Sequence, residues 1–122
     1  MNHSAEFVAL CDDAKSRIQE CSADQAEALM AKTIPTLLID VRDSDEFSAG
    51  HLPQAQFMSK GWIEAKIHHL APQKDTPIIL YCGGGNRSAI AADNLQKMGY
   101  TQVVSMIGGY KSWVKMGKRT VT

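Results

Sequence analysis

The residues with the clearest chemical potential are a cysteine and the glycine-rich loop that follows it. The apolar run Ile78–Tyr81 ends at Cys82, and three glycines, an arginine and an alanine-rich helical pattern come next. This order predicts a thiol at the C-terminal end of a buried strand, where backbone N–H groups and a helix N-terminus point toward it. Such surroundings stabilise a thiolate and bind an anion. The candidate nucleophile is therefore Cys82, and the candidate anion-binding loop is Gly83, Gly84, Gly85, Asn86, Arg87 and Ser88.

A buried structural cysteine before a glycine turn is the alternative interpretation of the same residues. Buried cysteines are common, and a lone cysteine would favour that alternative. Here the glycines allow successive N–H groups to curl around the sulfur, and Arg87 adds positive charge beside it. Ser88 can cap the next helix or hydrogen-bond to the loop, and either contact would preorganise it. These additions favour a functional cysteine.

Composition points to one cytoplasmic domain and excludes several classes of partner. The chain has 122 residues, 44% of them hydrophobic, and its 13 basic and 13 acidic residues give a net charge of zero. This size favours a single core. No basic block is present, so no nucleic-acid partner is expected. No apolar run approaches the roughly 20 residues of a membrane span, and the N-terminus lacks the layout of a secretion signal.

The other metal-binding and thiol residues give no second site. The cysteine number is odd and no CxxC pair occurs, which favours a reducing compartment and predicts no disulfide framework and no metal. Cys11 is expected to pack on a helix face, although Cys11 or Cys21 could be a surface thiol that accepts sulfur or forms an intermolecular disulfide. The histidines lack metal-binding spacing, and His68-His69 is interpreted as a solvated helix end.

Hydrophobic periodicity predicts helices alternating with strands. Helices are expected at 4–16, 22–30, 44–50, 61–70 and 88–98 and after Gly109, and strands at 17–20, 37–41, 55–58, 78–81 and 103–106. Ser4 can cap the first helix, and Ser22 with Gln25 fits a capping box for the second. The alternation with short loops predicts an α/β fold with a mainly parallel sheet of about five strands.

The first helix lies in an N-terminal extension, residues 1–16, ahead of a single domain at 17–122. Its apolar stripe is expected to pack on the sheet of its own domain. Exchange of this helix onto a second subunit is the alternative, so both a monomer and a homodimer remain open.

Four blocks of this sequence resemble the rhodanese family. The Cys82 loop resembles its CxxGxR loop followed by Ser or Thr, and the other blocks are Leu38–Arg42 (LIDVR), Glu46–Ala55 (E-[YF]-x-x-GHIPGA) and Gly108–Trp113 (GGxxxW). The blocks occur in family order and cover about residues 17–116. The resemblance implies a three-layer α/β/α domain and a transferase of the thiosulfate sulfurtransferase type, with no cofactor.

The resemblance also implies the chemistry of Cys82. This residue would take a sulfane sulfur from thiosulfate or a persulfide donor and pass it to cyanide, a thiol or a protein thiol. A sulfur-carrier or binding module for a partner protein is one alternative, and a cysteine-based phosphatase or arsenate reductase is another. Related phosphatases carry their arginine six residues after the cysteine, whereas Arg87 stands five after Cys82, which favours sulfur.

Several further residues carry weaker expectations. Asp40 and Arg42 are candidate supporting residues, and a charge pair that orders nearby loops is favoured over direct lining of the site. His51 is expected to fix the turn before Pro53. Gln54 stands where the family usually has glycine, and we expect this to alter only a surface turn.

Many family members carry a basic or polar residue at the position of Gly83, so anion binding here would depend more on backbone amides and Arg87. Trp62 and Trp113 are expected in the core or at the rim of the pocket.

Overall fold

The elements of the fold alternate along the chain as the sequence predicts. The computed structural model describes residues 2–32 and 34–122. Its helices are α1 (Ala5–Lys15), α2 (Ala23–Met30), α3 (Ser44–Ala49), α4 (Ile63–Leu70), α5 (Asn86–Lys97) and α6 (Gly109–Lys115). Its strands are β1 (Gln19–Cys21), β2 (Leu37–Asp40), β3 (Gln56–Phe57), β4 (Ile78–Tyr81) and β5 (Val103–Met106). The predicted bounds differ from these by no more than two residues, and the most consequential shift is the start of α5 at Asn86.

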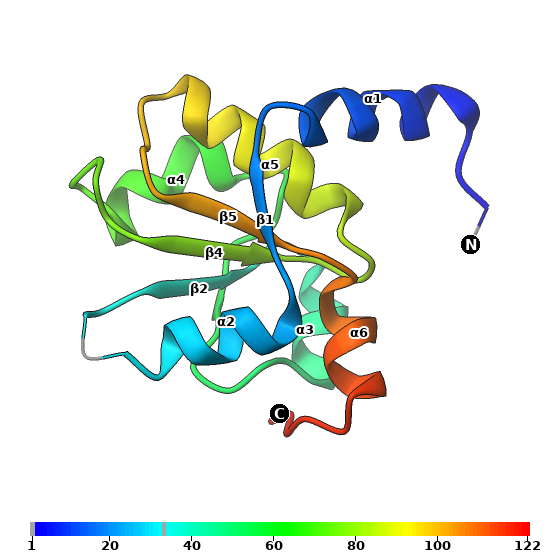
Figure 1. Cartoon of the computed structure of the whole chain (residues 1–122), viewed down its shortest axis with the longest axis vertical. Helices are drawn as coiled ribbons and strands as arrows, with labels where there is room; N and C mark the ends of the chain where they lie inside the picture. Colours follow the sequence, from blue (N-terminus) through cyan, green and yellow to red (C-terminus); the bar gives the residue numbers. More distant parts are fainter. Residues whose placement is uncertain (1, 33) are drawn as a thin grey trace.

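The five strands form one parallel sheet in the order β1-β5-β4-β2-β3 (Figure 1). Strand β4 lies at its centre, with Ile78 opposite Leu37 of β2 and Val103 of β5. Parallel strands end at the same edge of a sheet, so the loops that follow β1, β2, β4 and β5 meet there. This is the edge where ligands bind in open α/β sheets.

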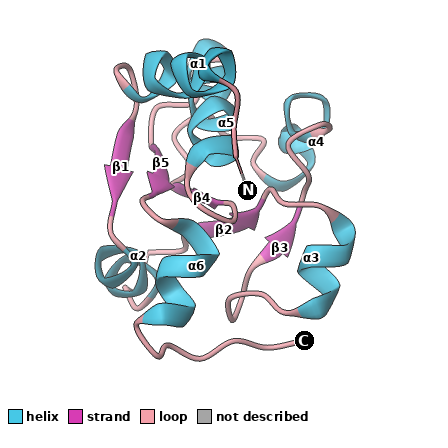
Figure 2. Ribbon diagram, turned by 90° about the vertical axis from the view of Figure 1, so that its right-hand side faces the viewer, coloured by secondary structure: helices cyan, strands magenta, loops and turns pink. Residues whose placement is uncertain are grey.

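Alternating side chains of the strands build two apolar cores. Ile39, Ile78 and Leu80 pack with α4 and α5, whereas Ile79 and Tyr81 pack with α2 and α6. Helices therefore cover both faces, and Figure 2 shows the sheet between these two layers. The predicted three-layer α/β/α domain is confirmed.

Helix α1 packs against α5 and not on the sheet, which corrects the expected site of its docking (Figure 1). Ser4 caps it as predicted, because its Oγ accepts the Phe7 N–H at 3.1 Å. Arg17, just after α1, donates to both Asp93 oxygens on α5 at 3.0 and 2.8 Å, and Lys15 donates to Asn86 Oδ1 at 3.0 Å. Polar contacts thus hold the extension against the helix that follows the cysteine loop.

The capping box of α2 is also present, with Ser22 Oγ accepting the Gln25 N–H at 3.1 Å and Gln25 accepting the Ser22 N–H. In the described part of the chain, no helix combines the length and apolarity needed to span a bilayer.

Candidate active site

Cys82 follows the last residue of β4 and is almost completely buried, with 1% of its surface exposed. Its Sγ accepts the Gly85 N–H at 3.1 Å and lies 3.4 Å from Ser88 Oγ. Gly85 has a φ of 101°, and a Cβ at this position would lie 3.2 Å from the Gly108 nitrogen. Glycine is required here because the turn that aims an amide at the sulfur needs a left-handed residue close to another backbone.

The start of α5 at Asn86 places Arg87 and Ser88 inside its first turn. The helix is capped by the left-handed Gly85, so Ser88 is not its N-cap. Ser88 Oγ instead lies between Cys82 Sγ and Ser105 Oγ, which is 2.8 Å away on β5. Of the two roles predicted for Ser88, the structure shows the hydrogen bond to the cysteine loop and not the cap of α5.

Helix α6 supports the loop from the side. Tyr110 N donates to the Cys82 carbonyl at 2.7 Å, and Lys111 N donates to the Gly83 carbonyl at 3.0 Å. Gly109 has a φ of 52°, and a Cβ there would overlap the Cys82 carbonyl oxygen. The two glycines that begin α6 therefore allow this close approach of its backbone to the cysteine loop.

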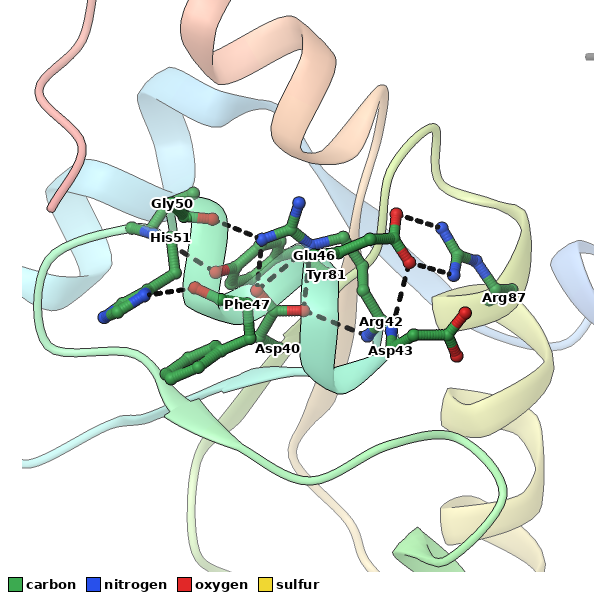
Figure 3. A network of polar contacts seen from close by, with 10 residues as sticks. Asp40, Arg42, Asp43, Glu46, Phe47, Gly50, His51, Tyr81 and Arg87 are labelled. Atoms are coloured by element: carbon green, nitrogen blue, oxygen red, sulfur yellow. Dashed lines mark hydrogen bonds and ion pairs between the residues drawn. The ribbon is translucent and has the colours of Figure 1, made fainter. Parts of the chain in front are cut away.

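Arg87 is held by a carboxylate that the sequence analysis did not assign. Its Nη1 lies 2.9 Å from Glu46 Oε1 and its Nη2 lies 3.3 Å from Oε2 (Figure 3). This contact lowers the pKa of Glu46, and the Asp43 N–H donates to the same Oε1 at 3.1 Å. The available sequence signal for Glu46 was its place at the start of one of the four blocks that resemble the rhodanese family.

A cavity of about 750 Å³ opens onto Cys82. The loop forms its floor, and its walls come from α1, from the start of α3, from Lys60 and from Lys111 on α6. This side of the molecule lies at the right in Figure 1 and faces the viewer in Figure 2. The wall contributed by the N-terminal extension, through His3 and Phe7, was not anticipated from the sequence.

Comparison with known proteins identifies the family. Residues 22–116 match the family model described as the rhodanese-like domain. The chain belongs to the rhodanese-like domain family.

Curated relatives of this chain include named sulfurtransferases. A thiosulfate sulfurtransferase, GlpE, from Pseudoalteromonas translucida is 37% identical over 63% of this chain and 71% of its own length. A sulfurtransferase from Allochromatium vinosum is 28% identical over 82% of this chain and 92% of its own. An uncharacterized protein, YqhL, from Bacillus subtilis is 36% identical over 62% of this chain, and the match spans only 59% of that relative.

Solved structures of similar shape carry two kinds of description. A protein from Rhodopseudomonas palustris, described as of unknown function and a possible tyrosine phosphatase, has a TM-score of 0.84 at 29% identity and is matched over 99% of both chains. The polysulfide-sulfur transferase homodimer from Wolinella succinogenes has a TM-score of 0.82 at 27% identity, with 96% of this chain and 88% of that chain covered. Both likenesses extend beyond the residues of the family match.

Asp40 and Arg42 form a buried charge pair that does not line the cavity. Arg42 Nη2 lies 2.8 Å from Asp40 Oδ2 and donates to the Gly50 carbonyl at 2.6 Å (Figure 3). The guanidinium also lies 4.2 Å from the centre of the Tyr110 ring. Neither residue lines the cavity, and their contacts order the segment around Gly50 and support α6.

His51 and Gln54 shape the segment that follows α3. His51 Nδ1 lies 2.9 Å from the Phe47 carbonyl, and its backbone forms an antiparallel bridge with Val121 near the C-terminus. Gln54 has a φ of 71°, a left-handed conformation that explains why the family usually has glycine there. Its side chain is exposed, as the prediction of an altered surface turn requires.

The remaining thiols and tryptophans divide between confirmed and wrong predictions. Cys11 and Cys21 are buried, at 0% and 5% exposure, so the surface-thiol alternative is wrong. Burial raises the pKa of both thiols, that of Cys21 to about 11. Trp113 is in the core as predicted, whereas Trp62 is 60% exposed and lies outside it. Within residues 2–32 and 34–122, no group of three or more acidic, histidine or cysteine side chains could hold a metal.

Proposed function

We propose that the protein is a thiosulfate sulfurtransferase-type enzyme that moves a sulfane sulfur through a persulfide on Cys82. The observation that carries this proposal is the hydrogen bond from Gly85 N–H to a buried Cys82 Sγ in a loop that places Arg87 five residues later. A buried sulfur with an amide donor suits a thiolate and, after reaction, a persulfide. Family membership and the named sulfurtransferases among its relatives support the same chemistry.

In the first half-reaction, the Cys82 thiolate attacks the outer sulfur of thiosulfate. A bond forms between Cys82 Sγ and that sulfur, the S–S bond of thiosulfate breaks, and sulfite leaves with the bonding electron pair. In the second half-reaction, an acceptor such as cyanide or a thiolate attacks the outer sulfur of the persulfide. The Cys82 thiolate is then regenerated, so two-step kinetics of the ping-pong type are expected.

Arg87 contributes to this reaction by releasing the Glu46 carboxylate and binding the thiosulfate dianion in its place. The Arg87 and Glu46 side chains are 33% and 38% exposed, and ion pairs at such positions contribute about 0–1 kcal/mol. An incoming dianion therefore competes with Glu46 for the guanidinium. Glu46→Gln should lower KM for thiosulfate several-fold and Arg87→Ala should raise it, and an unchanged KM in both variants would contradict this role.

The deciding experiment is intact-mass analysis of the protein after incubation with thiosulfate. We expect one added sulfur atom on the wild type, its loss on exposure to cyanide, and no addition on Cys82→Ser. Absence of any added sulfur from thiosulfate and from persulfide donors would refute sulfur transfer. Sulfur that loads but passes only to a protein thiol would indicate a carrier module for a partner.

A cysteine-based phosphatase is the second candidate, because the Rhodopseudomonas palustris protein described as a possible tyrosine phosphatase is similar over 99% of both chains. Such an enzyme needs a general acid for its leaving group, and Asp43 lines the cavity, whereas Asp40 is fully buried against Arg42. Hydrolysis of p-nitrophenyl phosphate that disappears in Cys82→Ser and Asp43→Asn would establish this activity.

A further inference from the structure

A second cavity, of about 260 Å³, lies on the face of the sheet that α2 and α6 cover. Figures 1 and 2 both show α2, α6 and the C-terminal segment gathered on this side. We call it the Trp113 cavity, after the buried indole in its wall. Among the described residues, it shares no lining residue with the cavity at Cys82, so it is a separate site.

The floor of the Trp113 cavity is apolar and is made of buried side chains. Leu38 of β2, Leu52 and Trp113 of α6 are at most 7% exposed, and Met30 of α2 lies beside them. Ala26 of α2 also faces this space, and its methyl group is too small to fill it. An apolar cavity of roughly 150 Å³ is enough to hold a benzene molecule. The Trp113 cavity therefore has room for one ring or for a branched chain of similar size.

The mouth of this cavity carries a cation that has no partner in the described part of the chain. The Arg119 carbonyl accepts the Trp113 Nε1–H at 2.8 Å, and His51 and Val121 exchange two backbone hydrogen bonds of 2.9 Å. These contacts hold the C-terminal segment across the cavity. The Arg119 guanidinium forms no ion pair within 4 Å with any described residue. A planar guanidinium beside an apolar floor suits a carboxylate, which it can bind through two hydrogen bonds.

Two other exposed residues at the mouth restrict the charge of the ligand. Glu27 lies 2.8 Å from Lys118, so Arg119 is the charge that an incoming ligand meets first, and the Glu27 carboxylate repels any second negative charge. Gln54 adds a neutral amide, although its φ of 71° is unfavourable for a residue with a Cβ. Strained residues of this kind occur at ligand clamps, where their side chains are needed. The mouth thus fits a single negative charge.

We propose that the Trp113 cavity is a binding site for a small hydrophobic monocarboxylate, an acid with one ring or a branched hydrocarbon group. The hydrocarbon group packs on Leu38, Leu52 and Trp113. The carboxylate accepts hydrogen bonds from the Arg119 guanidinium and the Gln54 amide. Because the two cavities share no lining residue, this site does not depend on Cys82 or on the sulfur-transfer function proposed above.

Binding is tested by NMR titration of the full chain with phenylacetate. The chain has two tryptophans, and Trp62 is the internal control because it is 60% exposed and does not line the cavity. We expect a saturable shift of the Trp113 indole N–H signal and none of the Trp62 signal. Equal shifts of both signals would overturn the proposal. Cys82→Ser should bind phenylacetate as tightly as the wild type, and loss of binding in this variant would contradict a separate site.

Two analogues of the probe separate the contribution of the charge from that of the ring. Phenylacetamide has the same shape without the charge and should bind about threefold more weakly, as loss of one exposed charge contact predicts. Acetate keeps the charge without the ring and should give no saturable shift. Equal affinities for phenylacetate and phenylacetamide would refute recognition of a carboxylate, and saturable binding of acetate at the same affinity would refute the apolar floor.

Substitutions at the mouth and in the floor test the two halves of the site. Arg119→Gln should weaken phenylacetate binding about threefold. Lys115→Gln is the matched control, because Lys115 is an exposed cation of α6 that does not line the cavity. Ala26→Leu places a larger side chain in the cavity and should abolish the shift of the Trp113 signal. If Ala26→Leu does not fold, Arg119→Gln decides, since Arg119 is exposed, and unchanged binding in that variant would overturn the proposal.

Gln54→Gly should change stability and binding in opposite directions. Glycine adopts the left-handed conformation without strain, so the melting temperature should rise by a few degrees. Loss of the side-chain amide should weaken phenylacetate binding about threefold, as loss of one hydrogen bond predicts. A side chain that only shapes the turn would change stability and leave binding unaltered, and this result would overturn the assignment of Gln54 to the site.

Discussion

Two cysteines of this protein, Cys21 and Cys82, stand in matching places of the sheet and have different hydrogen-bond surroundings. Cys21 ends β1 and Cys82 follows β4, both strands point to the same edge of the sheet, and a helix begins within four residues of each thiol. Both are buried, at 5% and 1% exposure. At the start of α2 the Gln25 amide donates to Ser22 Oγ, whereas before α5 the Gly85 amide donates to Cys82 Sγ.

This comparison shows that burial at a strand end does not prepare a thiol for reaction. Burial, with a smaller contribution from the charge of Glu20, raises the pKa of Cys21 to about 11, because a thiolate loses its hydration in an apolar environment. A nucleophilic thiol in the same place needs donors aimed at the sulfur. In this fold the donor to Cys82 comes from a glycine loop, whereas at the start of α2 the Gln25 amide donates to Ser22 and not to Cys21.

The largest expected effect comes from Gly109, which allows α6 to hold the Cys82 loop. Gly109→Ala should destabilise the protein by more than about 3 kcal/mol, because left-handed strain adds to overlap with the Cys82 carbonyl. Sulfur loading should fall with it. The control is Gly117→Ala, also left-handed at φ 76° but with open space around it, and denaturant unfolding should show a loss of only about 1 kcal/mol. Equal losses would mean that α6 does not position the loop.

The next prediction concerns the reactivity of Cys21 toward an alkylating agent. A pKa raised from 9.0 to about 11 lowers its thiolate fraction at neutral pH about a hundredfold. Peptide mapping after brief treatment of the folded protein with iodoacetamide should find Cys82 modified and Cys21 unmodified. Prompt labelling of Cys21 would remove the contrast between the two sites, and unfolded protein, in which both must react, is the control.

The raised pKa of Cys21 also predicts a loss of stability at high pH. The unfolded thiol ionises near 9.0 and the folded thiol near 11, so the folded state binds more protons between these values. The free energy of unfolding therefore falls as pH rises from about 9 to about 11, by about 2 kcal/mol from this group. Denaturation curves at pH 8 and pH 11 should show a smaller fall for Cys21→Ala, and an identical fall would contradict neutral burial of Cys21.

The smallest effect tests whether the Ser22 cap keeps Cys21 unreactive. Ser22→Ala should cost about 1 kcal/mol, as loss of an N-cap usually does, and Ser4→Ala at α1 is the matched control. We expect no sulfur loading at Cys21 in either variant, because one freed amide does not replace a glycine loop. Loading of Cys21 in Ser22→Ala alone would show that a single helix amide is sufficient.

Much of the fold was predictable because its signals are local. Capping residues, apolar strand runs and glycine turns act within a few positions, and the caps at Ser4 and Ser22 are present as predicted. The position of Cys82 followed from the same local signals. The docking of α1 did not, because an apolar helix face does not specify whether a sheet or another helix covers it.

The partners of the site residues were less predictable because they are distant in sequence. Glu46 and Arg87 are separated by 41 positions, and no periodicity relates them. Phe7, Lys60 and Lys111 meet only when α1, the segment before α4 and α6 converge around the cavity. Asp40 and Arg42, in contrast, are two positions apart, and the charge pair favoured for them is the one observed.

The central place of β4 has a consequence for heat inactivation. Its four residues are all buried and are paired with β2 on one side and β5 on the other. Segments of this kind open only when the whole domain unfolds, whereas peripheral elements open at lower free energy. Since Cys82 follows this strand directly, the temperature at which sulfur loading is lost should coincide with the midpoint of global melting.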